Sequence, residues 1–364
     1  MLTHKINVVQ TMMLFTLAIG ITNHVIIVPL ILNAAHRDSW ISAFMAIPPL
    51  IIWTIIVFFV MRLTNQKSLY DWFKAHYNPL IAWLVIVPII VFLIFILFVT
   101  VRDTSSWTKV SYLPKTPYPI TVSLFVLTSF FAAMAGLRTI TIAAGLLLPA
   151  VILFGFFVMS VNFQFKDYSY LTPIFTNGYK PIFHGTVYAL GGFVEFVLLL
   201  AMQQHLSKKF RLSSILFLTL AVTGLIFGPI MASIAIFGPF EAADQRYPAF
   251  EQWRMVLLGK FISHLDFLSI YQWLAGSLTR ISLSLFLLFD LLKMTRSRSK
   301  GIWMFLTCSV LIIVTSQKGI SDNMFFHFLQ YYFFPFACTF FYFFPFLLLL
   351  MIVMKRGKRK HELG

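Results

Sequence analysis

Apolar runs of about 20 residues recur along the whole chain, and they restrict its fold more than any other feature. A helix of about 20 apolar residues crosses the ~30 Å hydrocarbon layer of a membrane and satisfies its own backbone hydrogen bonds there. The alternating pattern that would predict a membrane barrel is absent from the sequence. We therefore predict an all-α integral membrane protein with about ten transmembrane helices, a single polytopic domain over residues 1–364. The predicted spans are approximately residues 9–32, 40–62, 80–101, 118–136, 140–162, 184–205, 212–238, 262–290, 301–317 and 335–354.

The composition agrees with lipid as the main solvent of the surface. Only 11% of the residues are Asp, Glu, Lys or Arg and 59% are hydrophobic, whereas soluble domains carry roughly 25% charged residues. A soluble fold needs more charge than this to cover its surface. The composition excludes a cytosolic enzyme, a disordered tail and a secreted module held by disulfides. Cys308 and Cys338 lie in apolar runs, where we expect them to be small core residues.

The distribution of Lys and Arg predicts the orientation in the membrane. The formal net charge is +16. Most basic residues fall in segments on the side of the N-terminus, and most acidic residues fall on the other side. Because cytoplasmic loops carry the excess of Lys and Arg, we expect both termini in the cytoplasm. Residues 355–364 then form a basic cytoplasmic tail, which can also bind anionic lipid.

Two spans contain residues that disfavour a continuous helix. In the first span, Gly20 is followed by the polar residues 22–24 and then by Pro29; in the sixth, Gly191 and Gly192 are adjacent. Glycine weakens a helix by about 1 kcal/mol relative to alanine, so local unwinding is plausible. Each glycine could instead serve close helix packing. Interruptions at corresponding positions in two halves favour an inverted-repeat transporter fold with broken first and sixth helices, in which exposed backbone groups bind a solute.

One acidic residue, Glu195, lies deep inside a span. An unpaired carboxylate in a membrane costs at least a few kcal/mol, so Glu195 must be paired, protonated or in contact with water. It could bind a substrate ammonium or carry a proton, or it could make a structural bond to Arg280 or to a backbone group. Arg280 could alternatively extend toward the cytoplasmic side. For Asp290, at a helix end, we expect an ion pair with Lys293.

Motifs for other kinds of chemistry are not found in the sequence. The nine histidines lack paired ligand spacing, so we expect no metal. GxSxG, HExxH and phosphate-binding glycine motifs are also absent, so we expect that the protein is not an enzyme and binds no cofactor. The GxxxG pair Gly224 and Gly228 is expected to pack against a neighbouring helix.

Three segments resemble the B subunits of spore germinant receptors, the endospore germination permease family. The segment GITNHVIIVPLILNAAHRDSWIS (20–42) is similar to the first-helix region of that family, NGYKPIFHGTVYALGGFVEFVLLLAM (177–202) to its sixth helix, and GKFISHLDFLSIYQWLAGSLTRIS (259–282) to its eighth-helix region. The matching residues are Gly20, Pro29, Arg37, Asp38, Trp40, Pro181, Gly185, Glu195, Asp266 and Trp273. Asn23 and His24 depart from many relatives, which are small there, and would alter the volume and donors of a pocket.

The resemblance implies the LeuT-like fold of the amino acid–polyamine–organocation superfamily and residence in the inner membrane of an endospore. It also implies A-type and C-type (lipoprotein) partner subunits and a nutrient ligand, often an amino acid. The ligand would lie between the broken helices, with further contacts from the third and eighth helices assigned by position alone. The expected ligand-binding residues are Gly20, Thr22, Asn23, Phe98, Val101, Gly191, Gly192, Phe193, Glu195, Tyr271 and Thr279.

A second hypothesis uses the same residues differently. A proton-coupled amino acid permease would bind its substrate in the same pocket, with Glu195 carrying the proton. A third hypothesis is a structural subunit that lines an ion path. The sequence does not separate a locked transporter fold from one that cycles, because both share their binding sites.

Overall fold

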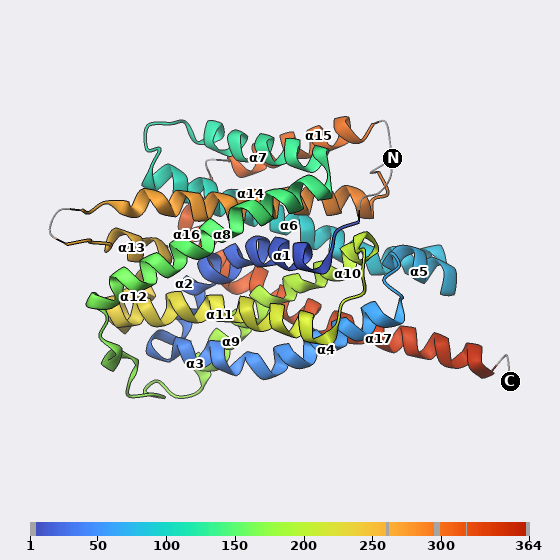
Figure 1. Cartoon of the computed structure of the whole chain (residues 1–364), viewed down its shortest axis with the longest axis horizontal. Coiled ribbons are helices and arrows are strands. Elements are labelled where there is room, and N and C mark those ends of the chain that lie inside the picture. The colour runs from blue at the N-terminus through green and yellow to red at the C-terminus, as the bar shows by residue number, and fades with distance from the viewer. Residues whose placement is uncertain (1–4, 260–261, 295–298, 318, 362–364) are drawn as a thin grey trace.

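The computed structural model describes residues 5–259, 262–294, 299–317 and 319–361, which fold almost entirely into helices (Figure 1). The first long helical stretch consists of α1 (Val8–Ile21), η1 (Thr22–Ile26), α2 (Val28–Ala35), η2 (His36–Asp38), α3 (Ser39–Met45) and α4 (Ile47–Leu63). It is followed by α5 (Leu69–His76), α6 (Pro79–Ser111), α7 (Tyr118–Ala135), α8 (Leu137–Val161), η3 (Asn162–Phe165) and η4 (Tyr168–Leu171).

The second half begins with another interrupted helix. Its elements are α9 (Lys180–Phe193), η5 (Val194–Val197), α10 (Leu198–Met202) and η6 (Gln203–His205), then α11 (Leu212–Phe237), α12 (Pro239–Asp244) and α13 (Pro248–Arg254). The chain ends with η7 (Leu265–Phe267), α14 (Leu268–Leu291), α15 (Lys300–Thr315), α16 (Asp322–Phe328), η8 (Leu329–Phe333) and α17 (Phe334–His361).

Side-chain caps and prolines set the starts of several helices. Asn7 accepts a hydrogen bond from the backbone N–H of Gln10, and Gln10 accepts one in return from Asn7, a reciprocal capping box before α1. Asn78 caps α6 in the same position, and Pro79 follows as the first helical residue, where its missing N–H costs nothing. Ser321 caps α16. These local signals lie between the apolar runs and divide them into separate helices.

Eight helical stretches in the described part of the chain are long and apolar enough to cross a membrane. The first, Val8–Leu63, contains both of the first two predicted spans, which are joined through the 3-10 turn η2. The ninth predicted span corresponds to α15, which has 16 residues. The last stretch, Asp322–Arg356, is longer than predicted, because most of the expected loop at 318–334 is helical. The helices therefore form an integral, multi-pass membrane protein.

The loops that are predicted to lie on the same side of the membrane as the N-terminus are close to one another in the structure. The backbone N–H of Ile6 donates to the carbonyl of His205 (3.0 Å), and the N–H of Ser207 donates to the carbonyl of Ile6 (2.8 Å). The Lys293 ammonium pairs with Asp71 at 2.6 Å. In Figure 1 this end carries α5, α10 and the C-terminal part of α17. We call it the inner end.

The connections predicted on the opposite side also meet one another. Arg246, between α12 and α13, pairs with Asp103 of α6 (2.7 Å) and Asp322 of α16 (3.0 Å). The carboxylate of Asp38 accepts a hydrogen bond from the N–H of Phe175 at 3.1 Å. We call this the outer end; α12 and α13 lie there in Figure 1. These connections therefore gather at two opposite ends of the bundle.

The two interrupted helices lie inside the bundle. Every residue from Gly191 to Gln203 is buried. In the contacts between helices, α1 packs against α14, α8 and α11, whereas α2 and α17 pack against α9, and α6 packs against α14. Outer helices instead expose large apolar side chains, such as Phe131 on α7, Trp303 on α15 and Phe343 on α17. This arrangement places the helix breaks in the protein interior and the apolar surface toward lipid.

Both predicted breaks are changes of helical pitch. The first span becomes a π-helix at η1, where the N–H of Ile27 donates to the carbonyl of Thr22 (3.0 Å). The sixth span tightens to a 3-10 helix at η5. Both segments are helical and the residues that flank them keep right-handed helical backbone angles, so the expected unwinding does not occur. A backbone that remains helical keeps its polar groups bonded inside a membrane, which explains the difference.

A candidate solute site at the helix breaks

A buried ion pair joins the interrupted helices to the bundle. The guanidinium of Arg280 on α14 donates from Nε to Oε2 of Glu195 (3.2 Å) and from a terminal nitrogen to Oε1. Its other terminal nitrogen donates to the hydroxyl of Thr100 on α6. The hydroxyl of Thr22, the first residue of η1, donates to Oε1 of Glu195 (3.1 Å). One cluster thus connects η1, η5, α6 and α14.

The geometry of this cluster shows that Glu195 is paired with Arg280. Both side chains of the Glu195–Arg280 pair are only 2% exposed, so Arg280 does not extend to the membrane surface. Both carboxylate oxygens of Glu195 already accept hydrogen bonds. A buried pair of this kind is sensitive to the loss of either partner, because the remaining charge is left without compensation.

Asn23 marks a polar position with unused hydrogen-bonding capacity. Its side chain is fully buried, and neither Oδ1 nor Nδ2 has a partner in the described structure. Buried polar atoms in native proteins are nearly always paired. A Cβ atom added to Gly192 would collide with Oδ1 of Asn23 and would lie 2.7 Å from Cδ1 of Ile27. The two breaks are therefore in direct contact, and the amide of Asn23 keeps two unpaired polar atoms at that contact.

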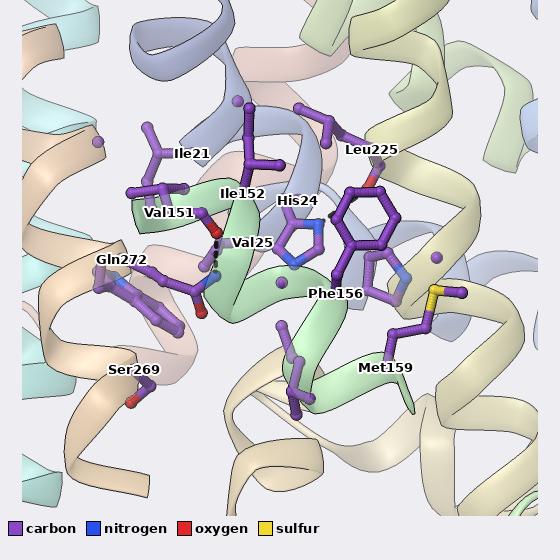
Figure 2. Close-up of a pocket in the computed structure, with 18 of the residues that line it drawn as sticks. Ile21, His24, Val25, Val151, Ile152, Phe156, Met159, Leu225, Ser269 and Gln272 are labelled. Atoms are coloured by element: carbon purple, nitrogen blue, oxygen red, sulfur yellow. Dashed lines mark hydrogen bonds between the residues drawn. The ribbon is translucent and has the colours of Figure 1, made fainter. Parts of the chain in front are cut away.

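The opposite face of η1 borders a cavity of about 370 Å³ (Figure 2). Gly20, Ile21, His24 and Val25 form one wall, and residues of α8, α11, α13 and α14 form the others. Figure 2 shows His24 between α8 and α11, with Phe156 beside it. This volume lies at the lower end of the roughly 300–1,000 Å³ range of small-molecule pockets.

A few polar groups are distributed over the mainly apolar wall of this cavity. Nδ1 of His24 lies 2.9 Å from the carbonyl oxygen of Leu225, to which it can donate. Nε2 of Gln272 donates to the carbonyl of Val151 (2.9 Å), and Oε1 of Gln272 accepts from Nε1 of Trp253 (2.9 Å). An apolar pocket with few fixed polar groups suits a small solute that is itself largely apolar.

Glycines of α11 widen this cavity. A Cβ added at Gly224 or Gly228 would meet nothing within 4 Å, and both residues line the cavity. The expectation that this GxxxG pair packs against a helix is therefore wrong. Small residues at a helix surface can either allow another helix to pack closely or leave a cavity, and the sequence alone does not distinguish these two outcomes.

The predicted site residues separate into three groups. Gly20 lines the cavity, whereas Thr22, Asn23, Gly192 and Glu195 meet where the breaks touch. The others contact neighbouring helices or lie inside the bundle. Gly191 lies against Phe334, Phe193 stacks on Phe196, and Phe98 contacts Phe325 and Phe328. The hydroxyl of Tyr271 donates to the carbonyl of Leu147, and Val101 and Thr279 are buried. Gln272 and Trp253 were not predicted as cavity residues; His24 was expected to alter a pocket but was not among the expected ligand contacts.

The pairing expected between Asp290 and Lys293 is also wrong. Lys293 pairs with Asp71, and Asp290 accepts a hydrogen bond from Gln204 and lies 2.7 Å from Nε2 of His205. The two contacts of Asp290 connect η6 to the last turn of α14 at the inner end. Within the described ranges, no three His, Cys, Asp or Glu side chains are grouped closely enough to hold a metal ion.

Comparisons with known proteins place the chain in a family. A family model described as "Spore germination protein" matches residues 5–324. Spore germination protein XB of Bacillus anthracis is 39% identical over 357 residues, which cover 98% of this chain and 99% of that protein. The putative spore germination protein YfkT of Bacillus subtilis (strain 168) is 22% identical over 279 residues, 75% of each chain. The chain therefore belongs to the spore germination protein family, the spore permeases, as its sequence resemblance predicts.

Proposed function

We propose that this chain is the B-type, nutrient-sensing subunit of a spore germinant receptor, located in the inner spore membrane with both termini in the cytoplasm. It binds a small nutrient, an amino acid, and signals to A-type and C-type (lipoprotein) partner subunits. Family membership and 39% identity to spore germination protein XB support the receptor assignment. The mainly apolar cavity beside the first helix break supports a nutrient with an apolar side chain.

The observation that carries this proposal is the position of η1 between two different environments. One face of this short π-helix borders the cavity through His24 and Val25. The other presents Asn23 to the sixth span and bonds Thr22 to Glu195. A solute bound on either face acts directly on η1. The proposed contacts are Gly20, Thr22, Asn23 and Gly192, with His24 and Gln272 added by the geometry of the cavity.

A change of pitch in η1 provides the signal in this proposal. π-helical segments are found frequently at functional sites, and their exchange with α-helix rotates the residues that follow. If the nutrient binds one pitch more tightly than the other, it shifts the population toward that pitch. The shift moves Thr22 relative to Glu195 and Arg280. Because Glu195 lies on η5, and Arg280 lies on α14 and is bonded to α6, a local change at η1 is transmitted to these elements.

The ion pair favours a sensor over a proton-coupled permease. A carboxylate that carries a proton must exchange it during each cycle, but both oxygens of Glu195 accept hydrogen bonds and its charge is matched by Arg280. Transport by this chain would require the cluster to separate in every cycle. A sensor requires only a shift between two arrangements.

One experiment separates the two functions. The purified protein is titrated with a panel of radiolabelled amino acids, first in detergent and then in sealed vesicles with a proton gradient. A sensor gives saturable binding and no accumulation in the vesicles. Accumulation without partner subunits would assign the chain to the permeases instead. A protein that binds no member of the panel, although its spores respond to one of them, would place the nutrient site on another subunit.

A further inference from the structure

A second cavity, of about 690 Å³, lies at the outer end and away from the helix breaks. Residues of α6, the start of α7, the loop before α13 and the segment after α15 line it. Its charged lining residues are Arg102, Lys109, Arg246 and Asp322. None of the residues predicted from the sequence as ligand contacts lines this cavity.

Arg102 is buried here with neutral partners. Its side chain is 7% exposed. It donates to the hydroxyl of Tyr118 (3.2 Å) and to the carbonyls of Thr315 (3.2 Å) and Ile320, and its Nε has no partner. Among the described residues no carboxylate pairs with it. Burial of a cation without a counter-charge is costly, so the arrangement favours an anion next to this guanidinium.

The surrounding charges leave an excess of one cation. Lys109 donates to two loop carbonyls, of Pro114 (2.5 Å) and Thr116 (2.7 Å). Arg246 pairs with Asp103 and Asp322 but keeps one terminal nitrogen without a partner. Among the residues that the structure describes, three cations therefore stand against two carboxylates, Asp322 in the lining and Asp103 behind Arg246.

An acceptor without a partner lies among these cations. Oδ1 of Asp322 is buried and has no hydrogen-bond partner within the described ranges. The cavity thus combines donors for an anionic group with an acceptor for a cationic one. A planar carboxylate matches the forked geometry of a guanidinium, and an ammonium group matches a carboxylate oxygen.

We propose that this outer cavity is a binding site for a small zwitterion that carries a carboxylate and an ammonium, an α-amino acid. Arg102 binds the carboxylate, and Asp322 accepts from the ammonium. The site is separate from the helix breaks, and the proposal rests on this cavity and not on the nutrient-sensing role. The matching charges distinguish it from the mainly apolar cavity beside η1.

The test uses the full chain in lipid nanodiscs and three probes: acetate, glycine and methylamine. Saturation-transfer NMR measures the binding of each. We expect acetate and glycine to bind and methylamine, which lacks the carboxylate, to bind about tenfold more weakly. Arg102→Gln should weaken acetate binding by roughly tenfold or more, because a charge-assisted hydrogen bond is lost. Asp322→Asn should weaken the binding of glycine and not that of acetate.

Matched variants keep the test decisive. Arg254→Gln removes an exposed arginine of the outer end that pairs with Glu251, and it should leave acetate binding unchanged. If Arg102→Gln fails to fold, Arg102→Lys keeps the charge but not the fork, and should bind acetate severalfold more weakly than the wild type. Equal acetate binding by Arg102→Gln and wild type, or no acetate and glycine binding by the wild type at millimolar concentrations, overturns the proposal. Loss of acetate binding in Asn23→Ala but not in Arg102→Gln would move the site to the helix breaks; the outer site would then fall and the proposed function would stand.

Discussion

At the scale of single residues, the buried charges carry most of the information in this chain. A carboxylate inside an apolar run is expensive in a membrane, so Glu195 stood out in the sequence, and Arg280 was one of few groups able to compensate it. The structure pairs them. The hydroxyls of Thr22 and Thr100 complete the cluster. The participation of Thr100 was not predictable, because threonine is common in transmembrane helices and its partners depend on how the helices pack.

The ion pair predicts an asymmetry between single and double substitutions. Glu195→Gln should lower the free energy of unfolding by about 3–5 kcal/mol, because Arg280 stays buried without its counter-charge. The double variant Glu195→Gln, Arg280→Gln should recover part of this loss. Glu251→Gln, which breaks an exposed pair, should cost less than about 1 kcal/mol. Thermal unfolding in detergent measures all three. Equal destabilisation by Glu195→Gln and Glu251→Gln would contradict the structural role of the buried pair.

Two glycines with different surroundings give a second prediction. Gly192→Ala introduces a Cβ that collides with Asn23 and Ile27, so it should destabilise the protein by about 1–3 kcal/mol, as overpacking does. Gly224→Ala meets open space and should be neutral, or more stable by up to about 1 kcal/mol through its helix propensity. The melting temperatures of the two variants provide the comparison. Similar melting temperatures would show that the breaks are not in close contact.

At the scale of the elements, the sequence predicted where the helices depart from regular geometry but not how. Glycines and polar residues marked the positions of η1 and η5. The choice of π-helix at one and 3-10 helix at the other depends on the helices that pack against each segment from elsewhere in the chain, α11 against η1 and α17 against η5. For the same reason α16 and η8 were not predicted: they lie between the ninth and tenth predicted spans, where a connection was expected.

The π-helix predicts an unusual tolerance to shortening. A π-helical segment can be described as an α-helix with one inserted residue, so deletion of Val25 should restore regular pitch and leave the protein able to accumulate in the membrane. If η1 is the switch proposed above, the response of spores to nutrient should be lost, because η1 can no longer change its pitch. Immunoblots and germination assays measure the two effects. Deletion of Leu30, within the regular helix α2, is the control and should prevent accumulation. A normal nutrient response after deletion of Val25 would exclude η1 as the switch.

At the scale of the whole molecule, the apolar runs were sufficient to predict an all-helical membrane protein and the grouping of its connections at two ends. The cavities were not predictable. The cavity beside η1 depends on the distance between α8 and α11 at Gly224 and Gly228. The charge of the outer cavity depends on Arg102, which has no carboxylate partner among the described residues. Both cavities result from how distant parts of the chain pack together, which cannot be derived from the local residue pattern of one sequence.

Labelling with a maleimide that does not cross membranes tests the predicted orientation. The native Cys308 and Cys338 are buried and should react slowly. Ser169→Cys, an exposed position of η4 at the outer end, should be labelled in intact vesicles of native orientation. Ser207→Cys, at the inner end, should be labelled only after the membrane is made permeable. The reverse pattern would place the termini outside the cytoplasm.

The short backbone pairing of Ile6 with residues 205–207 has a mechanical consequence. It fastens the entry of the first span to the exit of the sixth, so these two segments cannot slide apart at the inner end while those bonds hold. Toward the outer end the same two spans are joined by other contacts: α2 and α3 pack against α9, and the hydroxyl of Thr186 donates to the carbonyl of Ser42 (3.2 Å). Removal of residues 1–7 should therefore loosen the inner end and leave the contacts at the outer end in place.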